Sequence, residues 1–138
     1  MKLAWILWLA SILPPQAADS LCLSTTLCLE ARDQPVRGQQ AVAEVALRRQ
    51  DSGRWGDSMC DVVTARKQFA PTIVPPGTRL SNNEAWSQAV TIALEAERRQ
   101  KAPVLVVDPD HARVAVHQHH ALAGVGKQLE HRPRGEFE

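Results

Sequence analysis

Apolar positions recur at helical spacing along the first two thirds of the chain and predict several helices. A Leu-rich stretch indicates a short helix over 21–31. A stripe of alanine and valine, made by Ala41, Val42, Val45 and Ala46, indicates a second helix that is capped by Asp33 and extends to about Arg49. The other expected helices are a third over 57–65 and a fourth from Ser81 or Asn82 to about Arg99.

Two apolar runs near the C-terminus predict strands. Residues 104–107 and 113–117 are short and valine-rich, and Asp108-Pro109-Asp110-His111 between them is a turn sequence. We therefore expect an α+β, mainly helical single domain over 19–126 with a small β-hairpin near its C-terminus, followed by a polar tail at 127–138. Residues 67–83 are rich in Pro, Thr and Asn, and a long loop of this kind usually lines a site or is mobile.

The first eighteen residues have the pattern of an export signal. Lys2 is followed by eleven uncharged residues, all apolar except Ser11, and Pro14-Pro15 ends the run. As a helix this run spans about 16 Å, well short of the roughly 30 Å core of a bilayer. We predict that residues 1–18 are a signal peptide or N-terminal membrane signal, and that the domain is secreted or periplasmic. Membrane contact, including a transient inner-membrane anchor, would involve this segment only. A buried N-terminal helix is the alternative.

Charge and composition exclude several classes of function. The 16 Lys and Arg residues are balanced by 15 Asp and Glu residues, so the chain lacks the excess of basic residues that nucleic-acid binding requires. There is no Tyr and there are only two Phe, which leaves few aromatic faces for stacking bases. We therefore expect no nucleic-acid partner. The length of 138 residues, with 44% hydrophobic residues, fits one globular domain, which we expect to be monomeric.

The cysteines and histidines raise the question of disulfides and metals. Three cysteines, Cys22, Cys28 and Cys60, allow three pairings in an oxidising compartment, and the residues alone do not choose among them. The cluster His117-Gln118-His119-His120 lacks the pair of His residues four apart, with a Glu, that a zinc-protease helix carries. We therefore expect a solvated His-rich turn, no metal and no cofactor.

Glu30 is the candidate for chemistry. It follows apolar residues at the end of the Leu-rich helix, in the segment Leu27-Cys28-Leu29-Glu30-Ala31-Arg32. A carboxyl group shielded from water has a raised pKa and holds a proton near neutral pH, which a donor to a glycosidic oxygen must do. The alternative is an ordinary Glu at the edge of an amphipathic helix, paired with Arg32 or with a distant Arg.

Several segments, taken in order, resemble the cell wall hydrolase family of the spore-cortex-lytic enzymes (SleB-like). Glu30-Ala31-Arg32 and the stretch 38–49 resemble the Glu-Ala-Arg segment and the Gly-Gln-x-Ala-Val-Ala helix of that family. The later segments that carry the resemblance are Cys60-Asp61-Val62-Val63, Gln68-Phe69, Trp86, Asp108-Pro109 and His117. The chain departs from the family at Asp33-Gln34, where the family has Gly-Glu, and at Arg48, where it has Asn.

This resemblance implies a lysozyme-like domain that cuts peptidoglycan glycan strands between N-acetylmuramic acid and N-acetylglucosamine. Glu30 would act as acid and then as base of a lytic transglycosylase, in which the 6-hydroxyl of the sugar displaces the leaving group and gives a 1,6-anhydro product. Gln68, Phe69, Trp86 and His117 would bind the substrate. An ordinary glycosidase needs a second carboxylate, for which the candidates near Glu30 are Asp33, Glu44 and Asp61.

The resemblance also implies a disulfide between Cys22 and Cys60, with Cys28 left free. A swapped pairing through Cys28, two residues from Glu30, would act as a redox latch. Other functions stay open: muramidase-type hydrolysis at the same site, a non-catalytic wall-binding protein on the same fold, or an amidase or peptidase that uses the His cluster with a metal. A bacterial enzyme of wall remodelling and a phage endolysin fit the sequence equally well.

Overall fold

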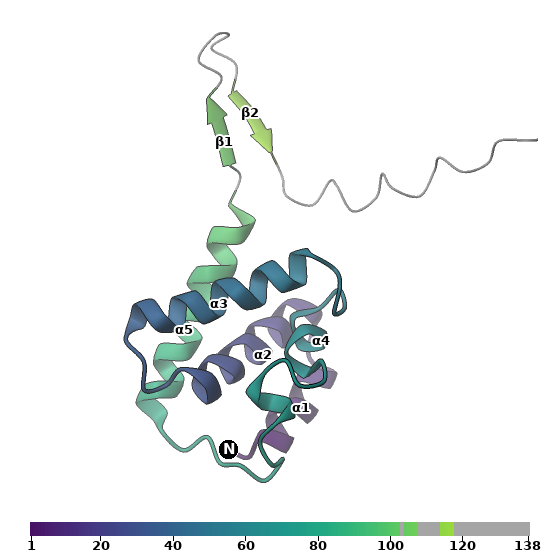
Figure 1. The fold of residues 1–138 in the computed structure, drawn as a ribbon, viewed down its shortest axis with the longest axis vertical. Helices are drawn as coiled ribbons and strands as arrows, with labels where there is room; N and C mark the ends of the chain where they lie inside the picture. Colours follow the sequence, from purple (N-terminus) through teal and green to yellow (C-terminus); the bar gives the residue numbers. More distant parts are fainter. Residues whose placement is uncertain (103, 108–113, 118–138) are drawn as a thin grey trace, which may run out of the picture. The chain divides into compact units, whose positions relative to one another are not determined.

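The computed structural model describes residues 1–102, 104–107 and 114–117, and confirms that the protein is mainly helical (Figure 1). It divides into two units, Met1–Gln100 and Lys101–Glu138. The elements are the helices α1 (Leu3–Ile12), α2 (Pro15–Glu30), α3 (Val36–Asp51) and α4 (Met59–Thr64), the 3-10 turn η1 (Ala70–Thr72), helix α5 (Asn83–Lys101), and the strands β1 (Val104–Val107) and β2 (Val114–His117). Among the described residues, no helix has the length and apolar content needed to cross a bilayer.

Helix α2 is the centre of the first unit and contacts α1, α3, α4 and η1 (Figure 1). Its residues from Cys22 to Cys28 are all buried, including three hydroxyl residues whose Oγ atoms donate to carbonyl oxygens four residues earlier. This back-bonding pairs the hydroxyl groups inside the helix, so polar side chains can lie in the core without an unsatisfied donor. Helix α5 joins the same core through Ala89, Ile92 and Ala93.

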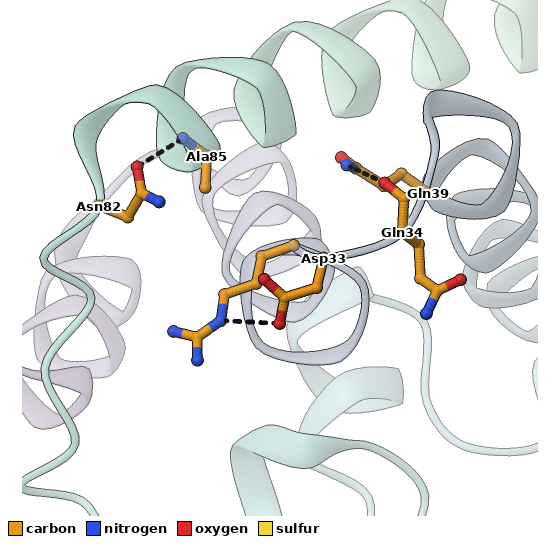
Figure 2. Close-up of polar contacts among 6 residues, drawn as sticks. Asp33, Gln34, Gln39, Asn82 and Ala85 are labelled. Carbon is orange, nitrogen blue, oxygen red and sulfur yellow. Dashed lines mark hydrogen bonds and ion pairs between the residues drawn. The ribbon is translucent and has the colours of Figure 1, made fainter.

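The start of α3 differs from the prediction that Asp33 caps it. The cap position is Pro35, no side chain caps this helix, and Asp33 is exposed and pairs instead with Arg32 at 3.4 Å (Figure 2). The turn before the helix is held by Gln39, which is 2% exposed and donates from Nε2 to the Gln34 carbonyl oxygen at 3.0 Å (Figure 2). A proline at the start fixes φ where the helix needs no N–H donor, so it can begin the helix without a capping carboxylate.

The next two helices begin with side-chain caps. In α4, Ser58 and Asp61 form a reciprocal capping box. In α5, Asn82 Oδ1 accepts from the Ala85 N–H at 3.1 Å, which confirms the predicted start of this helix (Figure 2). Such a cap satisfies amide groups that have no partner within the helix.

The N-terminal segment differs from the expectation that residues 1–18 stand apart from the domain. Helix α1 buries Leu3 and Ile6 at 0% and 1% exposure, and the Leu3 N–H donates to the Thr78 carbonyl oxygen at 2.9 Å. Helix α2 begins at Pro15 rather than near residue 21, so it runs without a break through the expected boundary at 18. This packing agrees with the alternative of a buried N-terminal helix, which the sequence pattern could not separate from an export signal because an apolar run can be buried by protein as well as by lipid. Its role as an export signal stays a prediction.

The second unit contains the two described strands near the C-terminus. Strands β1 and β2 pair antiparallel, with Val104 opposite His117 and Val107 opposite Val114. The expected turn at 108–111 and the expected polar tail at 127–138 lie outside the described residues.

Candidate active site

Glu30 is the last residue of α2, where the helix leaves the core. The buried stretch that ends at Cys28 and the buried Ala31 fix the backbone on both sides of it. The Ala31 N–H closes the helix by donating to the Leu27 carbonyl oxygen at 2.9 Å, and the Gln34 N–H donates to the Ala31 carbonyl oxygen at the same distance. Position 30 is therefore a rigid point from which a side chain can extend out of the domain.

The Glu30 side chain is exposed, which corrects the expectation that it is shielded from water. The apolar neighbours that suggested shielding are buried themselves, but the helix ends where Glu30 reaches the surface. Its Oε1 accepts a hydrogen bond of 2.5 Å from the Ala70 N–H, the first amide of η1. This bond holds the carboxyl in one orientation.

A cavity of about 270 Å³ lies beside this carboxyl. Helix α3 and the loop before η1 supply the other walls, and the lining residues are Glu30, Ala41, Val42, Val45, Gln68 and Phe69. The alanine and valine stripe that predicted this helix is divided between the core and the cavity. Ala46 is fully buried, whereas Ala41 and Val45 are exposed and face the cavity. A mostly apolar recess with one carboxyl and one amide is typical of a ligand site.

Arg49 supports the wall formed by Gln68 and Phe69. Its Nη1 donates to Gln68 Oε1 at 3.1 Å, and its guanidinium carbon lies 4.8 Å from the centre of the Phe69 ring and 5.4 Å from that of Trp55. A guanidinium group that stacks on aromatic rings while donating a hydrogen bond fixes several side chains at once. Sequence reasoning missed this residue, and it missed the amide of Ala70. The only sequence feature that pointed to Arg49 was its position at the end of the stretch 38–49, which resembles a helix of the family.

The three candidates for a second carboxylate are not among the residues that line this cavity. Asp33 pairs with Arg32, and Asp61 accepts from Ser58 in the capping box of α4. Glu44 lies 3.7 Å from Arg48 and lines a separate cavity between α3 and α5. Within the described part of the chain, Glu30 is the only carboxyl group that lines the cavity.

The predicted substrate-binding residues are brought together only in part. Gln68 and Phe69 line the cavity with Glu30. Trp86 is half-buried on α5, packs against the core and is not among the residues of the cavity wall. His117 ends β2 in the second unit, and the placement of its side chain lies outside the described residues, as do His119 and His120. Within the described residues, no three His, Cys, Asp or Glu side chains are grouped to hold a metal.

The disulfide between Cys22 and Cys60 is confirmed and joins α2 to α4, with the two Cα atoms 5.2 Å apart. Cys28 is a free, buried thiol. Burial raises the pKa of Cys28 above its usual value, and the charge of Arg32 opposes that shift in part. A thiol with a raised pKa holds its proton at neutral pH and is a poor nucleophile for disulfide exchange. Because Cys22 is bonded to Cys60 and Cys28 is free, the swapped pairing of the redox latch is not the pairing of this structure.

A larger cavity, of about 520 Å³, lies near the N-terminus and is lined by Met1, Lys2, Trp5, Arg79 and Ser81. None of these side chains carries a carboxyl group that could act as an acid, so the smaller cavity beside Glu30 is the better candidate for chemistry.

Comparison with known proteins matches more than half of the chain to one family. The model of a family described as Cell Wall Hydrolase matches residues 33–106, which is more than half of the chain. Neither the curated proteins nor the solved structures contain a significant match. The matched segment includes α3, Arg49, Gln68 and Phe69, and it begins three residues after Glu30.

Proposed function

The chain belongs to the cell wall hydrolase family, and from this premise we propose that it cuts the glycan strand of peptidoglycan with Glu30 as its acid. Membership of the family supports peptidoglycan as the substrate and an extracellular or wall-associated place of action. The bond cut would be the one between N-acetylmuramic acid and N-acetylglucosamine. The observation that carries this proposal is a single oriented carboxyl at the rim of an apolar cavity, with Oε1 held by the Ala70 N–H.

In the proposed reaction, Glu30 first donates a proton from Oε2 to the glycosidic oxygen as the bond from that oxygen to C1 of the muramic acid breaks. The Ala70 N–H then stabilises the carboxylate that remains. The carboxylate next takes the proton of the 6-hydroxyl as that oxygen bonds to C1. The products are a 1,6-anhydro sugar and a free 4-hydroxyl, and Glu30 recovers its proton.

The exposure of Glu30 is compatible with this role because the substrate itself can cover the carboxyl. A glycan in the cavity would lie against Ala41, Val45 and Phe69 and would displace water from the Glu30 side chain. Removing water strengthens the polar interactions inside the site, including the one between the carboxyl group and the glycosidic oxygen. The empty site would not need a buried acid.

A single-acid transglycosylase is supported over a muramidase by the surroundings of Glu30. A hydrolase of the ordinary kind uses a second carboxylate to activate water or to attack the sugar. In the described residues, the candidates Asp33, Glu44 and Asp61 are engaged elsewhere and none lines the cavity. The 6-hydroxyl of the substrate replaces that missing group.

The test is the activity of Glu30→Gln on purified peptidoglycan. We expect a loss of about 10²–10⁴-fold, the usual contribution of a general acid. Glu44→Gln is the matched control, because Glu44 is an exposed carboxylate of α3 outside the cavity, and it should keep normal activity. If Glu30→Gln still degraded purified peptidoglycan, Glu30 would not be the catalytic acid. A wild-type protein that bound peptidoglycan without degrading it would favour a binding role.

Mass spectrometry of the released fragments separates the possible reactions. Anhydro-muramic ends support the transglycosylase, whereas reducing ends of muramic acid would show the muramidase reaction at the same site. Free stem peptides would overturn glycan cleavage in favour of an amidase or peptidase. We further propose that the protein acts as a monomer after export to the periplasm or beyond, in wall remodelling or in phage lysis.

A further inference from the structure

Arg49 determines which end of the Gln68 amide can meet a ligand. A guanidinium group has only donors, so the Gln68 atom that it contacts at 3.1 Å must be the carbonyl oxygen, Oε1. The NH₂ group is then the end of the amide that Arg49 does not engage. Because Phe69 and Trp55 both stack against the guanidinium, Arg49 has little freedom to release this orientation.

Apart from the Glu30 carboxyl, the rest of the cavity wall is apolar. Gln68 lines the cavity beside Glu30, together with Ala41, Val45 and Phe69. An NH₂ donor beside a methyl-sized apolar surface is complementary to a group with a carbonyl oxygen at one end and a methyl at the other. An acetamido group has this arrangement, and a free amine has neither the acceptor nor the methyl.

We propose that Gln68 and the apolar wall form a subsite for the N-acetyl group of the glycan, and that Arg49 is the positioning residue that orients the Gln68 amide. This inference rests on the proposed function, and it adds a determinant of specificity to it. A site built to bond one polar group discriminates against an analogue that lacks the group, because the donor is then left unpaired. The enzyme should therefore prefer N-acetylated glycan to N-deacetylated glycan.

The test measures KM and kcat on peptidoglycan before and after chemical N-deacetylation. For wild type we expect KM to rise about tenfold on deacetylation, as one lost hydrogen bond would give. Arg49→Ala should raise KM on the acetylated glycan by a similar factor, leave kcat within about threefold, and abolish the discrimination. Arg49→Lys retains a hydrogen-bond donor but not the planar stacking, and it should keep part of the discrimination between the two glycans.

Three further variants make the result specific. Gln68→Leu should lose the same discrimination, and the double variant with Arg49→Ala should show no additional loss, because both changes remove one interaction. Arg48→Ala is the matched control, since Arg48 is the adjacent exposed arginine and pairs only with Glu44 among the described residues. It should behave as wild type on both glycans.

Several outcomes would overturn the inference. One is an equal KM of the wild-type protein for acetylated and N-deacetylated glycan. Another is an Arg49→Ala variant that changes only kcat, or that changes KM by the same factor on both glycans. If Arg49→Ala fails to fold, Gln68→Leu alone decides the question. Co-sedimentation of the inactive Glu30→Gln protein with each of the two insoluble glycans measures binding to the subsite without catalysis. A protein that prefers the acetylated wall there, but releases no glycan fragments as wild type, would refute the proposed reaction and leave the subsite standing.

Discussion

The orientation of the Glu30 carboxyl depends on one backbone amide. Ala70 is 40 residues away in the chain, yet its N–H is bonded to Glu30 Oε1. The donor is available because η1 begins there and its first amide has no partner within the turn. Sequence motifs identify side chains, and a contact made by a backbone group at a distant position carries no residue-type signal.

Replacing Ala70 by proline removes this donor with little change elsewhere. Phe69 has an extended backbone, φ −141° and ψ 163°, which is the region that a residue before proline favours. We expect Ala70→Pro to lower kcat about 10-fold to 100-fold, the range for losing a hydrogen bond to a charged group. Ala70→Gly keeps the N–H and should retain most of the activity. Normal turnover by Ala70→Pro would show that this amide does not hold the catalytic carboxyl.

At the scale of elements, α1 is divided into a buried face and an exposed face. Leu3 and Ile6 are buried at 0% and 1% exposure, whereas Trp5 and Trp8 are 64% and 57% exposed and stack edge to face. From Leu3 to Ala10 the sequence is entirely apolar, so its pattern could not distinguish the two faces. Only the neighbours of the helix decide which of these apolar residues contribute to folding.

The two faces should respond differently to truncation. Ile6→Ala should lower the free energy of unfolding by about 2–5 kcal/mol, because a buried methylene-rich side chain is lost and a cavity remains. Trp8→Ala removes a larger side chain from an exposed position and should change stability by about 0.5 kcal/mol or less. Urea unfolding of the full chain measures both. Equal and small effects would indicate that α1 does not pack on the domain in solution.

For the whole molecule, the site depends on links between helices that are distant in sequence. The disulfide joins α2 to α4 across a separation of 38 residues. Beside it, Asp19 accepts from the Met59 N–H at 2.8 Å and from Gln50 Nε2 at 3.2 Å, which ties α2 to α4 and α3. These links fix the helix that carries Glu30 relative to the helix that forms the cavity wall.

Removing the disulfide should therefore weaken the entire unit. In the chain-entropy account, a loop of this length contributes about 4 kcal/mol. We expect the double variant Cys22→Ser, Cys60→Ser to lose about that much stability in urea unfolding. Dithiothreitol should destabilise the wild-type protein by a similar amount and leave the double variant unchanged. A wild-type protein whose unfolding is insensitive to the reductant would contradict this role.

The helices from α3 to α5 were predicted well because their signals are local. Apolar spacing located them, and Asn82 is a residue type that favours the N-cap position. Asp33 failed as a cap for a reason that is also physical: Pro35 can begin a helix without a capping side chain, and the exposed carboxylate then pairs with its neighbour Arg32. A capping residue type shows that a cap is possible, whereas the geometry of the turn decides whether it forms.

Local spacing of residue types was sufficient to predict the helices of the middle of the chain, because each depends on residues close together in sequence. The family, and Glu30 as the candidate acid, came from the resemblance of several short segments taken in order. The exposure of Glu30, its partner at Ala70 and the support of Gln68 by Arg49 came only from the folded chain. So did the burial of Ile6 and the placement of Trp86 outside the cavity. These features depend on which distant segments pack together, and the free energy of that packing is shared among many residues rather than encoded at any one position.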